Sequence, residues 1–90
     1  MLAPSFTGPF KKDRKLLKKQ NKNIEKLNDV MNMIINEQPL PPERYNHPLK
    51  GEWKNSYGCH IQGDWVLIYE PEHKTHTVIF HRTGSHSELY

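Results

Sequence analysis

Groups that can move protons or bind phosphate are concentrated in three short blocks in the second half of the chain. The blocks are His47-Pro48-Leu49-Lys50-Gly51, His60-Ile61-Gln62-Gly63-Asp64-Trp65 and Arg82-Thr83-Gly84-Ser85-His86-Ser87-Glu88-Leu89-Tyr90. Together they supply three imidazoles, an aspartate carboxylate, a guanidinium and a phenol. This combination contains the groups needed to cleave RNA without a metal ion.

Metal-free cleavage of RNA uses the ribose 2′-hydroxyl as the nucleophile. A base accepts its proton, a cation meets the charge that grows on the phosphate, and an acid protonates the departing 5′-oxygen. Histidine suits both proton transfers because its unperturbed pKa of about 6.5 leaves both forms populated near neutral pH. The candidates for these transfers are His47, His60 and His86, and the forked Arg82 guanidinium is the candidate for phosphate binding.

Three further side chains in the same blocks could support this chemistry. Asp64 either orients a neighbouring imidazole or acts as the base itself. Trp65 and Tyr90 offer flat surfaces on which single-stranded bases stack, worth roughly 1 to 3 kcal/mol each at such sites. Taken alone, Trp65 would be a core residue at the head of an apolar strand, and Asp64 a turn former. Their occurrence together with the histidines favours a site.

Metal binding and cysteine chemistry have weaker support. His73, His76 and His81 have no companion motif, and their spacing matches no closed zinc pattern, so we expect surface histidines, no metal and no cofactor. The single cysteine, Cys59, cannot form an intramolecular disulfide. Its neighbour His60 points to the opposite face of a strand, which favours a buried inert thiol over a nucleophile.

Two helices are expected in the first half of the chain. Pro9 resembles a first-turn proline and predicts a helix over about 9–20. Apolar residues at helical spacing predict a second helix over 22–36. The polar stretch between them indicates an antiparallel hairpin. Residues 1–7 are either an edge strand or irregular chain, since Pro4 removes a hydrogen-bond donor.

The second half has the composition of strands. Prolines at 39, 41 and 42 end the second helix, and three runs rich in aromatic and β-branched residues follow. The runs cover 59–62, 65–69 and 77–80, with tight turns expected at 63–64 and 71–74. The prediction for residues 1–90 is therefore a single α+β domain in which an N-terminal helix hairpin packs on a curved antiparallel β-sheet. In this arrangement the ends of several elements border one concave face.

Size and charge limit the remaining possibilities. With 90 residues, of which 34% are hydrophobic, the chain supports one small domain with a thin core. No apolar run reaches the length of a signal-peptide core or a membrane span, so a cytoplasmic protein is expected. Residues 11–26 hold eight basic side chains against Asp13 and Glu25, in a chain of net charge +3. Such a stripe either attracts a polyanion or an acidic protein, or is only a solvated helix face.

The three blocks resemble the YafQ branch of the RelE superfamily, bacterial type II toxins that cut messenger RNA on the ribosome. The resemblance covers nearly the whole chain. It implies the RelE-like microbial RNase fold, and it implies that four residues carry cleavage while others assist or bind RNA. The first group is His47, His60, Asp64 and His86; the second is Trp65, Arg82 and Tyr90. A DinJ-type antitoxin is the implied partner, and operator DNA is reached only through that antitoxin.

Two departures from the family pattern affect the expected activity. Ser56-Tyr57-Gly58 stands where the family often has an aromatic, an arginine and an acidic residue, so a basic contact to RNA is either missing or supplied by Lys50 or Lys54. Gly63 stands where proline is common, which loosens the turn that carries Asp64. Weaker turnover or a different codon preference would follow.

The sequence therefore predicts an enzyme, a ribosome-dependent endoribonuclease that leaves a 2′,3′-cyclic phosphate and a 5′-hydroxyl. His86 is assigned as the acid, Asp64 or His47 as the base, His60 as the orienting partner and Arg82 as the phosphate ligand. The alternative is a non-catalytic relative that binds the ribosome or the antitoxin and acts as a transcriptional co-repressor. A DNA-binding domain that uses the lysine-rich helix is weaker, because no base-reading helix is evident. That helix, within 11–26, is expected to contact ribosomal RNA or an acidic part of the antitoxin.

Overall fold

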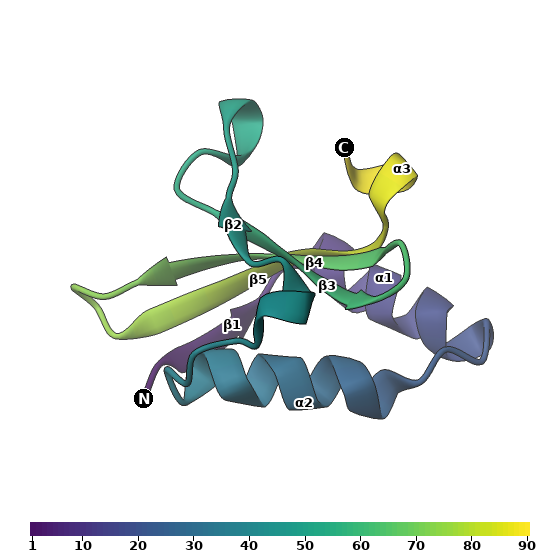
Figure 1. The fold of residues 1–90 in the computed structure, drawn as a ribbon, viewed down its shortest axis with the longest axis horizontal. Coiled ribbons are helices and arrows are strands. Elements are labelled where there is room, and N and C mark those ends of the chain that lie inside the picture. Colours follow the sequence, from purple (N-terminus) through teal and green to yellow (C-terminus); the bar gives the residue numbers. More distant parts are fainter.

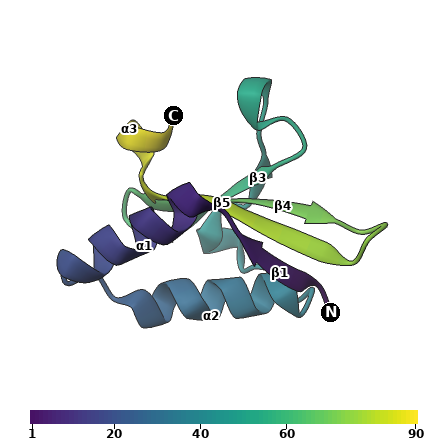
Figure 2. The ribbon, with the colours of Figure 1, turned by 180° about the vertical axis from the view of Figure 1, so that it is seen from behind.

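A five-stranded sheet in the order β1-β5-β4-β3-β2 forms the centre of the structure, a computed structural model that describes residues 1–90 (Figure 1). The strands are β1 (Ala3–Phe6), β2 (His47–Pro48), β3 (Tyr57–Gln62), β4 (Trp65–Glu72) and β5 (Thr77–Ser85). The helices are α1 (Gly8–Lys19), α2 (Ile24–Ile35) and α3 (His86–Leu89), with single 3₁₀ turns η1 (Pro42–Arg44) and η2 (Gly51–Trp53). Seen from behind, α1 and α2 lie below the sheet, and α3 rises on the other side (Figure 2).

The predicted α+β fold, with a helix hairpin packed on a sheet, is confirmed, but the sheet is mixed rather than antiparallel. β1 runs parallel to β5, with Ala3 opposite Thr77 and Phe6 opposite Phe80. All other neighbouring strands are antiparallel. The direction of β1 depends on a strand at the far end of the chain, which the local pattern of residues 1–7 does not specify.

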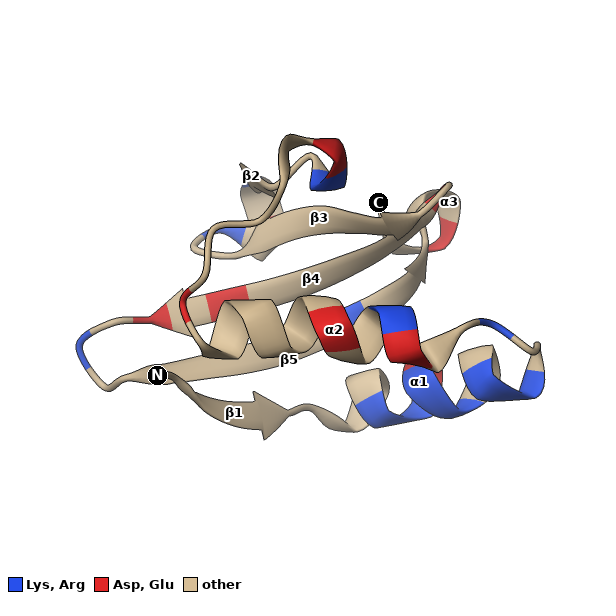
Figure 3. Ribbon diagram, turned by 60° about the horizontal axis from the view of Figure 1, so that its bottom comes forward, with Lys and Arg blue, Asp and Glu red and all other residues tan.

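The ends of both long helices follow from side-chain caps. The Thr7 hydroxyl accepts a hydrogen bond from the Phe10 amide (3.1 Å), and Pro9 occupies the first turn of α1. The Asn23 side chain accepts from the Glu25 amide (3.1 Å), so α2 begins at Ile24 rather than at residue 22. Lys and Arg positions make up much of α1, the strongest concentration of positive charge in the molecule (Figure 3). None of the helices combines the length and apolar character needed to cross a membrane.

Strand β4 is buried on both of its faces. Trp65, Leu67 and Tyr69 belong to the main core, where the sheet packs on α1 and α2. Val66 and Ile68 point the other way and pack against Leu89 of α3 in a second, smaller cluster. Leu49 and Trp53 border this second cluster. The side of the sheet that faces away from the helices therefore has a small apolar floor, and the residues around it form the candidate site described below.

Both expected hairpin turns exist, although the second is shifted. Gly63, in the first turn, has a φ of 57°, a left-handed conformation that proline cannot adopt, so this turn differs from one built on proline. The second turn was expected at 71–74, but β4 continues to Glu72, with Pro71 opposite Val78. Proline is tolerated there because β3 pairs with β4 only as far as Tyr69, so that side of β4 has no neighbouring strand at Pro71.

Candidate active site

The register of the sheet places two rows of functional residues on the face opposite the long helices. One row crosses from His47 through Gly58 and Ile68 to Arg82. The neighbouring row includes His60, paired with Val66. Because directly opposed residues point to the same face of a sheet, these side chains share the surface that bears the second apolar cluster. In Figure 1, α3 and the β2–η2 segment both rise from this face.

The three predicted histidines His47, His60 and His86 lie in this region, and the Tyr90 ring lies beside His86. The ring centroids of His60 and His86 are 6.4 Å apart, and those of His86 and Tyr90 are 4.5 Å apart with the rings nearly edge-to-face. The backbone amide of His86 donates to the carbonyl of Asp64 (2.7 Å), which ties the start of α3 to the β3–β4 turn. Asp64 thus sits next to His86 through the main chain, while its carboxylate is exposed and makes no hydrogen bond.

Hydrogen bonds to backbone carbonyl groups determine the tautomer of two imidazoles. His47 Nδ1 lies 2.7 Å from the carbonyl oxygen of Tyr45, and His60 Nδ1 lies 3.1 Å from that of Gly63. A carbonyl only accepts, so each Nδ1 carries the proton. In the neutral form, each Nε2 then has a free lone pair and can accept a proton. His86 makes no side-chain hydrogen bond and is exposed, so both of its ring nitrogens are open to a ligand.

Gly58 leaves the space in which the Tyr90 side chain sits. A Cβ atom at position 58 would collide with the Tyr90 hydroxyl and would lie 3.6 Å from His47 Cε1. The phenol oxygen and the His47 ring therefore both lie over the backbone of β3 at Gly58. Burial raises the pKa of the Tyr90 phenol, so the hydroxyl stays protonated at neutral pH and can donate a hydrogen bond.

Replacing Gly58 by alanine should expel the Tyr90 ring from this space. Tyr90 is 45% exposed at the end of α3, so we expect it to swing outward with a small loss of stability. Because the ring also packs on His86, we expect RNA cleavage to fall several-fold. Thermal unfolding and a cleavage assay measure the two effects, with Gly8→Ala as a control, since a Cβ there meets nothing within 4 Å. Full activity in Gly58→Ala would show that the Tyr90 position is unimportant.

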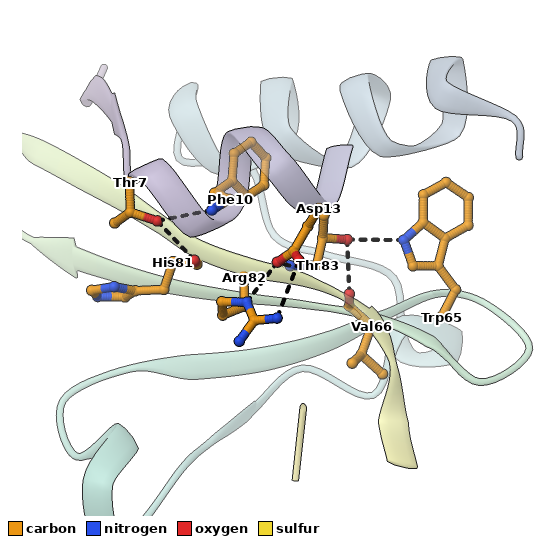
Figure 4. A network of polar contacts seen from close by, with 8 residues as sticks. All are labelled: Thr7, Phe10, Asp13, Trp65, Val66, His81, Arg82 and Thr83. Carbon is orange, nitrogen blue, oxygen red and sulfur yellow. Dashed lines mark hydrogen bonds and ion pairs between the residues drawn. The ribbon is translucent and has the colours of Figure 1, made fainter. Parts of the chain in front are cut away.

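Arg82 lies inside β5, because this strand extends to Ser85 and does not end at residue 80, as the sequence pattern predicted. Its Nε and Nη2 donate to the two carboxylate oxygens of Asp13 (2.6 and 3.1 Å), and the Thr83 amide donates to Asp13 Oδ2 (3.2 Å) (Figure 4). The hydrogen bond to Asp13 raises the pKa of Arg82, so its charge is permanent. Asp13 belongs to no motif recognised in the sequence, although this residue is the only acid within α1.

The expectation that Trp65 stacks on a base does not fit its position. Its side chain is 3% exposed in the main core, and its indole nitrogen donates to the Thr83 hydroxyl (2.9 Å). The Thr83 hydroxyl in turn donates to the Val66 carbonyl (2.9 Å), so Trp65 supports β4 and β5 from behind the site (Figure 4). Lys50 precedes η2 and is exposed, which leaves it available to RNA.

Of the three histidines outside the candidate site, two are exposed and one is half-buried. His73 and His76 are exposed in the β4–β5 turn, as expected, but His81 is half-buried and lies 2.9 Å from Glu70 Oε1. The inert Cys59 is confirmed, because it is 1% exposed and burial raises the pKa of its thiol to about 12. No group of three or more His, Cys, Asp or Glu side chains is arranged to hold a metal ion. Tyr45 belongs to none of the three sequence blocks, yet its ring packs edge-on against that of His60, with the ring centroids 5.4 Å apart.

Comparison with known proteins identifies the family. A family model described as a bacterial toxin of type II toxin-antitoxin systems, YafQ, matches residues 2–90. The chain belongs to the YafQ toxin family. The mRNA interferase toxin YafQ of Escherichia coli K12 is 40% identical over 86 residues, covering 94% of this chain and 91% of the relative. The resemblance detected in the three sequence blocks is thereby confirmed.

Solved structures of related toxins share the same fold. A metal-bound toxin from Helicobacter pylori superposes with a TM-score of 0.93 at 38% identity, covering 100% of both chains. The toxin in an E. coli DinJ-YafQ complex superposes with a TM-score of 0.91 at 36% identity, covering 100% of this chain and 99% of the other. The YafQ fold is therefore present from end to end.

Proposed function

We propose that this YafQ-family toxin is an endoribonuclease that cuts messenger RNA in the ribosomal A site and thereby inhibits translation. The observation that carries the proposal is the gathering of His47, His60, His86 and Tyr90 over one face of the sheet, in line with Arg82 across it. A binding surface alone does not require two imidazoles whose Nε2 atoms are both free to accept protons. The E. coli relative named an mRNA interferase supports the same assignment.

In the proposed reaction, His47 Nε2 or the Asp64 carboxylate accepts the proton of the ribose 2′-hydroxyl. The resulting oxygen attacks the adjacent phosphorus, and Arg82 stabilises the charge on the non-bridging oxygens. His86, in its protonated form, gives a proton to the departing 5′-oxygen. The 2′-oxygen–phosphorus bond forms as the bond from phosphorus to the 5′-oxygen breaks. The products are a 2′,3′-cyclic phosphate and a 5′-hydroxyl, and both proton transfers use side chains of this protein.

His60 and Tyr90 have supporting roles in this scheme. The His60 ring, fixed by its hydrogen bond to the Gly63 carbonyl, lies roughly parallel to His86 at 6.4 Å and limits the orientations of that ring. Tyr90 also packs against His86, with ring centroids 4.5 Å apart, and presents an exposed aromatic surface to an RNA base. Lys50 contributes positive charge at the margin of the site, where it would contact the RNA backbone.

The partners follow from charge and from the family. The basic residues of 11–26 would contact ribosomal RNA through a field that salt screens. The groove bordered by α1 and α2 has apolar Phe6 and Ile35 beside basic Lys11 and Lys15, which suits an acidic, partly apolar segment of a DinJ-like antitoxin. Antitoxin and ribosome would then compete for one surface. Operator DNA would be bound by the antitoxin and not by the toxin itself.

The test is cleavage of a defined message with and without ribosomes. We expect cuts in ribosome-bound message and much slower cutting of the same RNA free in solution, since orientation supplies several kcal/mol of barrier lowering. Mapping of the ends should find a 2′,3′-cyclic phosphate on one fragment and a 5′-hydroxyl on the other. Equal cutting of free RNA would contradict the dependence on the ribosome. Intact message with a soluble, ribosome-bound protein would favour the non-catalytic module.

A further inference from the structure

The Asp13 carboxylate connects helix α1 to the strand that carries Arg82. Its two oxygens accept from Nε and Nη2 of the guanidinium in a side-on pair, and Oδ2 also accepts from the Thr83 amide (Figure 4). That amide points to the edge of β5 that β1 leaves free, because β1 pairs only as far as Phe80. The carboxylate therefore takes the place of a neighbouring strand at this point of the sheet.

This pairing fixes the plane of the guanidinium and leaves its other edge open. Arg82 has five N–H groups, of which Asp13 receives two. Both hydrogens of Nη1 and one of Nη2 have no partner in the protein. The side chains are partly covered, with 36% of Arg82 and 16% of Asp13 exposed, so the pair is shielded from water more than a surface ion pair.

We propose that Asp13 is a positioning residue, which holds the Arg82 guanidinium in the orientation that binds the scissile phosphate. This inference rests on the nuclease function proposed above. A free arginine loses rotamer freedom when it clamps a phosphate, whereas here that freedom is already lost in the folded protein. Asp13 does not touch the RNA. It acts through Arg82, whose remaining donors match the paired oxygens of a phosphate.

A purely structural role for Asp13 makes a different prediction. If the carboxylate only anchors α1 to β5, its loss should reduce stability and leave the cleavage rate of the folded protein unchanged. If it positions Arg82, its loss should slow cleavage, and the loss should disappear once Arg82 is absent. A double-mutant cycle separates these two possibilities.

The experiment measures cleavage of ribosome-bound message by the full chain carrying Asp13→Asn, Arg82→Ala or both changes. We expect Asp13→Asn to lower the rate about tenfold to a hundredfold, because a displacement near 1 Å has effects of that order. The double variant should be no slower than Arg82→Ala alone. Asp29→Asn is the matched control, an exposed carboxylate on α2 that makes no hydrogen bond. Thermal unfolding of each variant shows whether it is folded at the assay temperature.

A second variant keeps the proposal testable should Asp13→Asn not fold. Asp13→Glu keeps the charge but lengthens the side chain by one methylene, which shifts the guanidinium, so it should fold and yet cleave more slowly. Wild-type rates in Asp13→Glu or in folded Asp13→Asn would overturn the proposal, as would a double variant whose loss is the product of the single losses. A wild-type toxin that leaves ribosome-bound message intact would overturn the nuclease function and this proposal with it.

Discussion

Replacing His86 by alanine should lower cleavage of ribosome-bound message by about 10²- to 10⁴-fold, the usual contribution of a general acid. Without the imidazole, the 5′-oxygen must leave without a proton donor. The ring is exposed, makes no hydrogen bond and packs only on Tyr90 and His60, so its removal should cost little stability. The measurement is the rate of appearance of the cut message, together with growth arrest on expression of the variant.

The control for His86→Ala is His73→Ala. His73 is exposed in the β4–β5 turn and lies outside the candidate site, so its loss should leave both cutting and growth arrest unchanged. The thermal unfolding midpoint of each variant shows whether the fold is retained. A His86→Ala protein that cuts at the wild-type rate would show that His86 is not the general acid and would make His60 the next candidate for that role.

Local sequence patterns were sufficient to predict the two long helices, the strands β3, β4 and β5 and a common region for the histidines, but not the short elements α3 and β2. The caps at Thr7 and Asn23 act within one turn of chain, so helix positions were predictable. His60 and His86 could be assigned to one region because each lies near the end of a strand that neighbours β4. The order of the strands is enough to predict which strand ends meet at one edge of a sheet, and no knowledge of side-chain packing is needed.

Long-range contacts were not predictable in the same way. A strand buried on both faces is a continuous apolar run, so the pattern of β4 could not show that Trp65 points into the main core and away from RNA. The ion pair between Asp13 and Arg82 joins residues at opposite ends of the chain. The only signal was an acidic residue in a strongly basic segment, and such a residue is usually a solvated helix position.

The identity of the base gives the second large prediction. We expect His47→Ala to lower cleavage by about 10²- to 10⁴-fold and Asp64→Asn to lower it much less. The structure supports His47 because its hydrogen bond to the Tyr45 carbonyl leaves Nε2 unprotonated in the neutral ring. The only interaction of Asp64 with the site is made by its backbone carbonyl, which accepts a hydrogen bond from the His86 amide, and Asp64→Asn retains this carbonyl. Rates of both variants on ribosome-bound message decide between them.

The outcome of this pair of substitutions assigns the base. Both side chains are exposed, so both variants should stay folded, and the thermal unfolding midpoint of each variant checks this. Loss of cleavage in Asp64→Asn, with cleavage retained in His47→Ala, would reassign the base to the carboxylate and leave His47 as a phosphate or ribose contact.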